Sequence, residues 1–149
     1  MNNISYISKA IILNIYDGDT MTVMTEIWPN LIIKSTIRLL CGDESAVDAW
    51  ELRGKERELG LIARQFVVNE LSNLEYVVLK VINKKEKYGR LLASVHYSEE
   101  YKDIEMICAF GKDLGIELIN NGSATAFVRG MNDSEQIMMI PEKWLNDYA

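Results

Sequence analysis

The chain has 149 residues, 48% of them hydrophobic and 26% charged, with a formal net charge of −6. This length predicts about one domain that can bury a core without disulfides, and the composition excludes disordered, collagen-like and low-complexity chains. The negative charge argues against binding nucleic acid through a broad basic surface, although carboxylates that hold a cation can still act on phosphates.

Three strands are predicted at the start of the chain. Residues 8–15 are β-rich and largely apolar, and residues 20–27 and 31–40 alternate between two faces. The residues expected to share one face are Met21, Val23, Thr25 and Ile27 in the second strand and Ile33, Ile37 and Leu39 in the third, where Lys34, Thr36 and Arg38 take the other face. The turn signal Trp28-Pro29-Asn30 between them favours an antiparallel meander.

A helix is predicted at about residues 54–72 from apolar residues at helical spacing, namely Leu59, Ile62, Ala63, Phe66, Val67 and Leu71. Strands are predicted at 76–82 and 90–97, with a solvated loop at 98–103. A short helix at 113–120 is expected to stop at Asn121-Gly122, and a last helix at 133–147 contains Pro141.

This order of elements predicts an α+β fold, mainly a β-barrel. Five short strands with one helix between the third and fourth are typical of a closed barrel of the OB type, here with about three helices in one domain over residues 1–149. Such barrels often bind oligonucleotides, but the fold alone does not give the function.

The sequence predicts an intracellular, cytoplasmic protein. Its apolar N-terminal stretch is too short for a signal peptide, and no apolar run approaches the roughly 18 residues that cross a membrane. We therefore expect Cys41 and Cys108 to stay reduced. One histidine and two scattered cysteines do not match zinc-site spacings, and we expect His96 at the strand surface.

Two acidic motifs are candidates for metal binding. Asp17-Gly18-Asp19-Thr20 reads either as an ordinary turn or as a strand start that presents a carboxylate to a hard cation. The segment Val47–Gly54 reads either as an acidic flank that complements a helix dipole or as a second metal carboxylate, Asp48, with a nearby base, Glu51.

Two basic motifs are candidates for phosphate binding. Lys87-Tyr88-Gly89-Arg90 reads either as a charged hairpin with a glycine bulge or as an arginine held at a strand start and aimed at a phosphate. Arg38 ends an apolar run, where an arginine needs a partner if it is buried.

The order of these motifs is more specific than any of them alone. DGDT, a strand with Arg-Leu-Leu, Val-Asp-Ala-Trp-Glu-Leu-Arg-Gly, an amphipathic helix and Lys-Tyr-Gly-Arg-Leu-Leu-Ala follow one another. This succession resembles the staphylococcal nuclease family over about residues 9–128, including Asp113–Phe127.

The resemblance implies Ca²⁺-dependent hydrolysis of DNA and RNA phosphodiesters that leaves 3′-phosphates, by a monomer that favours single strands and needs no membrane. The implied metal ligands are Asp19, Asp48 and the Ala49 carbonyl, with Asp17 supporting Asp19; Glu51 is the implied general base, Arg38 and Arg90 clamp the phosphate, and Lys87 and Tyr88 contact the substrate.

One departure leaves the second metal ligand open. The family pattern reaches its metal aspartate about five residues after the strand arginine, where Asp43 stands here, whereas Asp48 is ten residues away. We favour Asp48 because Val-Asp-Ala-Trp-Glu keeps the family's spacing from aspartate to glutamate, which makes residues 41–46 a loop insertion. If Asp43 is the ligand, Ala46 stands in the position of the base.

Two other functions fit the same barrel. A non-catalytic OB-type module would bind single-stranded nucleic acid or a protein partner. A structural protein would bind Ca²⁺ only for stability. The five residue types at Asp19, Arg38, Asp48, Glu51 and Arg90 favour the nuclease, because a degenerate module is expected to have lost some of them.

Overall fold

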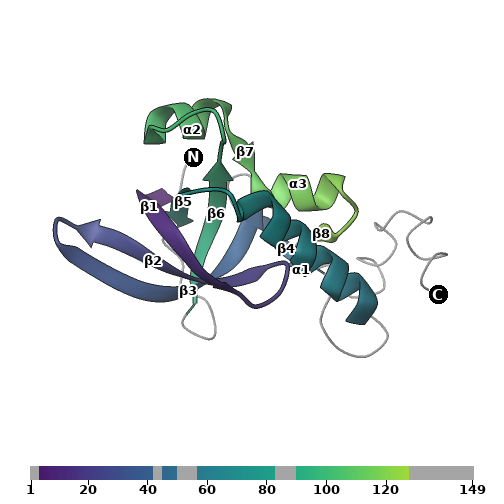
Figure 1. Cartoon of the computed structure of the whole chain (residues 1–149). Helices are drawn as coiled ribbons and strands as arrows, with labels where there is room; N and C mark the ends of the chain where they lie inside the picture. The colour runs from purple at the N-terminus through teal and green to yellow at the C-terminus, as the bar shows by residue number, and fades with distance from the viewer. Residues whose placement is uncertain (1–3, 42–44, 50–56, 83–89, 128–149) are drawn as a thin grey trace.

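The computed structural model describes residues 4–41, 45–49, 57–82 and 90–127. The elements are β1 (Ile4–Ile15), β2 (Thr20–Trp28), β3 (Leu31–Cys41), β4 (Ser45–Ala49), α1 (Arg57–Leu71), β5 (Val77–Ile82), β6 (Leu91–Tyr97), α2 (Ile104–Phe110), β7 (Lys112–Asp113), α3 (Leu114–Asn120) and β8 (Ala124–Phe127). Figure 1 shows their arrangement. None of the helices in these ranges has the length and apolar character to cross a membrane.

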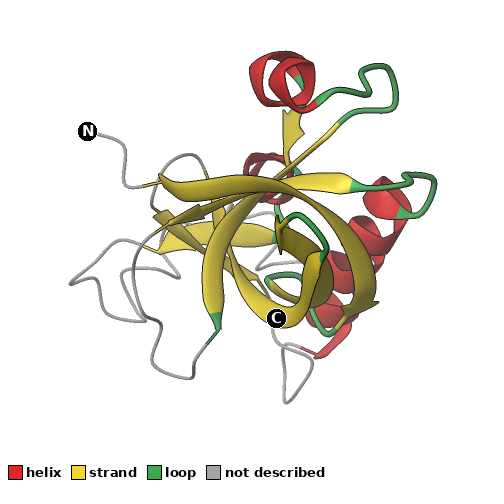
Figure 2. Ribbon diagram, turned by 90° about the vertical axis from the view of Figure 1, so that its left-hand side faces the viewer, coloured by secondary structure: helices red, strands yellow, loops and turns green. Residues whose placement is uncertain are grey.

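Five strands close a barrel. The strands β1, β2 and β3 form the predicted antiparallel meander, β5 and β6 pair antiparallel, and β1 pairs with β5. A parallel pairing of β3 with β6, in which Ile37 lies opposite Leu91, completes the ring. Figure 2 shows the strands curling around the enclosed core. The predicted α+β barrel of the OB type is therefore confirmed.

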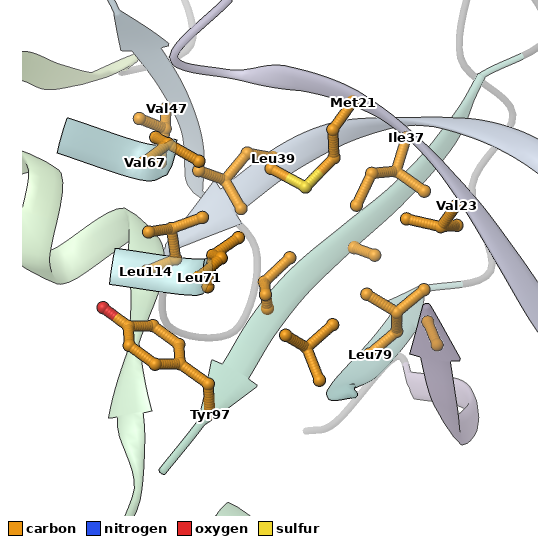
Figure 3. Close-up of a cluster of buried hydrophobic side chains, with 14 of the residues drawn as sticks. Met21, Val23, Ile37, Leu39, Val47, Val67, Leu71, Leu79, Tyr97 and Leu114 are labelled. Atoms are coloured by element: carbon orange, nitrogen blue, oxygen red, sulfur yellow. The ribbon is translucent and has the colours of Figure 1, made fainter. Parts of the chain in front are cut away.

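The core comes from the alternation of β2 and β3 and from one face of α1. Two residues of β2, Met21 and Val23, are fully buried, and so are Ile37 and Leu39 of β3. In each strand the two residues are two positions apart and therefore lie on the same face, as predicted. Val67 and Leu71 of α1 pack against this cluster from the side, as Figure 3 shows. In the described residues α1 begins at Arg57; the predicted start at 54 lies outside them.

The surface position expected for His96 is wrong. Helix α2, which the sequence did not reveal, packs against β5 and β6, and the His96 side chain is buried with 7% of its surface exposed. There His96 Nε2 and Ser94 Oγ share a hydrogen bond of 2.8 Å. The loop at 98–103 carries no helix or strand, as predicted.

The loop expected at residues 41–46 is corrected at both ends, whereas residues 42–44 lie outside the described residues. Cys41 ends β3 and Ser45 begins β4, and the two residues pair in an antiparallel register. Strand β4 then pairs with β8, which was not among the predicted strands. The predicted helix at 113–120 is confirmed as α3, whose N-cap is Asp113. The helix predicted at 133–147 lies outside the described residues.

Candidate functional site

The turn from β1 to β2 is held by its own backbone and by Asp17. The amides of Tyr16 and Asp17 donate to the Thr20 carbonyl at 3.1 and 3.3 Å. The Asp17 carboxylate accepts the Asp19 amide at 3.1 Å, which is the aspartate-to-backbone bond typical of such turns. Asp17 therefore fixes the backbone on which Asp19 sits, as the turn interpretation expects, and the metal-site interpretation stays a prediction.

Asp19 and Arg38 form an ion pair across β2 and β3. The register places Thr20 opposite Arg38, and the Leu39 amide donates to the Asp19 carbonyl at 2.8 Å. Only 6% of Asp19 is exposed. The arginine at the end of the apolar run thus has the carboxylate partner that its position requires.

Arg90, the residue just before β6, reaches the same place. Arg90 Nη1 lies 3.4 Å from Thr20 Oγ1, and the Thr20 hydroxyl donates to Asp19 Oδ1 at 3.0 Å. Arg90 stands next to Leu91, which lies opposite Ile37 in the parallel pairing with β3. The register of the barrel therefore brings Asp19, Arg38 and Arg90 together. Thr20 completes this group, although sequence reasoning gave it no role.

The carboxyl groups of Asp17 and Asp19 lie close together in the turn, and their negative charges repel each other. The pKa of Asp17 is raised to about 7, first because the carboxyl is partly buried and then because of its hydrogen bond to Asp19 and the charge of Asp19; the Asp19 amide and Arg38 act in the opposite direction. A bound divalent cation would relieve this repulsion. The oxygen donors of Asp17 and Asp19 match the hard ligands that Ca²⁺ prefers.

Asp48 lies in strand β4, so the acidic helix flank, one of the two interpretations of Val47–Gly54, does not apply to it. Its backbone pairs with Thr125 of β8, and the backbone of Ala49 pairs with Ala124. β4 lies along the same edge of β3 as β2, because β6 occupies the other edge at Leu40. β4 pairs with β3 as far as Leu40, two residues after Arg38, and its backbone therefore lies next to the start of β2.

The rest of the predicted site is only partly visible. The side chain of Asp48 and all of Asp43, Glu51, Lys87 and Tyr88 lie outside what the structure describes. Among the side chains that it does describe, no three His, Cys, Asp or Glu residues group closely enough to hold a metal ion. The roles of the predicted ligands and of the base remain predictions.

Comparisons with known proteins add no relative. No protein-family model matches the chain, and no curated protein matches it. The resemblance to the staphylococcal nuclease family therefore rests on the sequence motifs. The observed barrel is of the fold that this resemblance implies.

Proposed function

We propose that the chain is a Ca²⁺-dependent nuclease that hydrolyses DNA or RNA phosphodiesters and leaves 3′-phosphates. The observation that carries the proposal is the contact chain from Arg90 through Thr20 and Asp19 to Arg38, which joins residues from three separate parts of the sequence. A carboxylate beside two guanidinium groups is suited to a phosphate held between a cation and arginines.

In this proposal, one group of residues binds the cation and another group binds the phosphate. Asp19 would bind Ca²⁺, with Asp17 fixing the Asp19 backbone and with Asp48 and the Ala49 carbonyl as the further ligands that the resemblance implies. The cation, when bound, would neutralise charge that develops on the phosphate oxygens during water attack.

Arg38 and Arg90 would bind the phosphate directly. A guanidinium presents planar, paired donors that a lysine does not reproduce. Asp19 holds Arg38, and the Thr20 hydroxyl accepts from Arg90, so both groups are positioned before substrate arrives. Removing one such donor typically lowers the rate by about 10²-fold or more.

The general base is proposed to be Glu51. A carboxylate close to a cation and two arginines stays ionised at neutral pH, as a base that accepts a proton from water must. This assignment comes from the resemblance and needs its own test.

The direct test is cleavage of a single-stranded DNA oligonucleotide by the wild-type chain and by Glu51→Gln. We expect cleavage with Ca²⁺, none with a chelator, 3′-phosphate ends on the products and strongly reduced cleavage by the variant. Cleavage without Ca²⁺, or full activity of Glu51→Gln, would contradict the mechanism. Binding of the oligonucleotide without any cleavage would support the non-catalytic module instead.

A further inference from the structure

A groove of about 320 Å³ lies between the second half of β1 and the second half of α1. We call it the β1–α1 groove. Its apolar wall includes Leu13 on β1, Val68 and Leu71 on α1 and Leu74 after the helix. Leu13 is 45% exposed, which leaves an apolar surface open to a ligand.

The strand that forms one wall has an open edge. β5 pairs with β1 only from Ile4 to Ala10, and the described residues after Ala10 pair only with β2. The carbonyl of Ile15 points away from β2, because the Tyr16 amide of the same peptide group donates to Thr20 on the β2 side. A strand edge of this kind can take up another extended chain.

A half-buried arginine stands at the end of this edge. Arg64 of α1 donates from Nε to the Ile15 carbonyl at 2.9 Å, in the place where a neighbouring strand would offer an amide. Among the residues that the structure describes, no carboxylate forms an ion pair with Arg64. Glu75 also lines the groove, but it is exposed and makes no such pair. The remaining donors of Arg64 are therefore suited to an anionic group of a ligand.

We propose that the β1–α1 groove binds an extended peptide, which adds to the open edge of β1 and places its terminal carboxylate on Arg64. Because Arg64 stands at the last residue of β1, such a peptide runs parallel to β1. Alternate side chains of the peptide enter the apolar groove, and its backbone pairs with residues 11–14. This binding does not depend on the proposed nuclease activity.

The chemistry of the groove favours a peptide over a nucleic acid strand. Its lining mixes apolar and polar surface in about equal parts and it offers one arginine, whereas a nucleic acid backbone is usually tracked by several cations. The net charge of −6 also works against a second nucleic acid site.

In the test, the full chain is incubated with a library of random heptapeptides that have free C-termini, and the peptides that bind are selected. The best sequence is then synthesised as the free acid and as the C-terminal amide, and both are titrated by fluorescence anisotropy. We expect amidation and Arg64→Gln each to weaken binding by about 10-fold or more, because a charged hydrogen-bond pair is lost. Arg57→Gln is the matched control, since Arg57 is exposed on the same helix and does not line the groove.

Two further measurements keep the test decisive. Val68→Phe narrows the groove and keeps both residues of the bond from Arg64 to Ile15, so it should weaken binding even if Arg64→Gln disturbs the fold. Amides in residues 11–14 should gain protection from hydrogen exchange when the peptide binds. The proposal is overturned if no sequence is enriched, if the free acid and the amide bind equally, or if a single-stranded oligonucleotide takes the place of the selected peptide.

Discussion

Lowering the pH from 7 to 5 is expected to destabilise the barrel through His96. The imidazole is buried and shares a hydrogen bond with Ser94. Its pKa is lowered from 6.5 to about 4, first by burial and then by the charge of Lys80 on the neighbouring strand. Protonation of His96 therefore favours the unfolded chain.

The sign and the size follow from the two pKa values. The unfolded chain takes up the proton near pH 6.5, whereas the folded chain does so only near pH 4. The contribution of neutral His96 to stability is complete above pH 6.5 and is lost as the pH falls to about 4. Between pH 7 and pH 5 the loss is about 2 kcal/mol, a large share of the stability of a small domain.

Urea unfolding of the wild-type chain and of His96→Gln at pH 7 and pH 5 measures this loss. Glutamine keeps a hydrogen-bonding group for Ser94 but does not titrate, so the wild-type chain should lose about 2 kcal/mol more than the variant. Asp17, with its raised pKa, acts in the opposite direction in both proteins and cancels in the difference. Equal losses in the two proteins would refute the buried, neutral state of His96.

Three other substitutions test the site and the packing. Arg38→Lys should lower the cleavage rate by about 10²-fold or more, whereas Lys34→Ala, an exposed change on the same strand, should leave it unchanged; an active Arg38→Lys would count against the phosphate clamp. Gly115→Ala should destabilise the fold by about 1–3 kcal/mol, because an added Cβ would stand 2.6 Å from Cys41 Cβ and 2.8 Å from the Leu40 carbonyl oxygen; thermal unfolding measures it, and an unchanged midpoint would show that α3 can shift. Asp103→Ala removes the N-cap that accepts the Met106 amide at 2.8 Å and should cost about 1 kcal/mol in urea unfolding; no loss would mean that α2 adds little to stability.

The sequence predicted elements whose side chains follow a strong period. β2 and β3 alternate cleanly, so the sequence predicts that Met21 and Val23 share one face and that Ile37 and Leu39 share one, and these four residues are buried. β4 escaped prediction because its five residues are short of a clear period and pair mainly with β8, which is distant in the sequence. α2 escaped because six of its seven residues are apolar, so no contrast between an apolar and a polar face marks the helix, although Ile107 alone is buried.

The candidate site was predictable in part for a different reason. The order of the motifs nominated Asp19, Arg38 and Arg90, and the strand registers bring these three together. Thr20 was missed because its hydroxyl contacts Arg90, the residue before β6, only once the barrel has folded. The strand position of Asp48 was missed because its pairing partner, Thr125, carries no sequence signal that links it to β4.

The Ile15 carbonyl, at the end of β1, connects the β1–α1 groove with the candidate site. Arg64 holds the Ile15 carbonyl, and the turn that carries Asp17 and Asp19 follows at once. Arg64→Gln should therefore raise the Ca²⁺ concentration for half-maximal cleavage by roughly 2- to 10-fold, since one hydrogen bond contributes about 0.5–1.5 kcal/mol. Arg57→Gln should leave that concentration unchanged. An equal Ca²⁺ requirement in all three proteins would mean that the turn is set by its own hydrogen bonds, and that ligands in the groove do not influence the site.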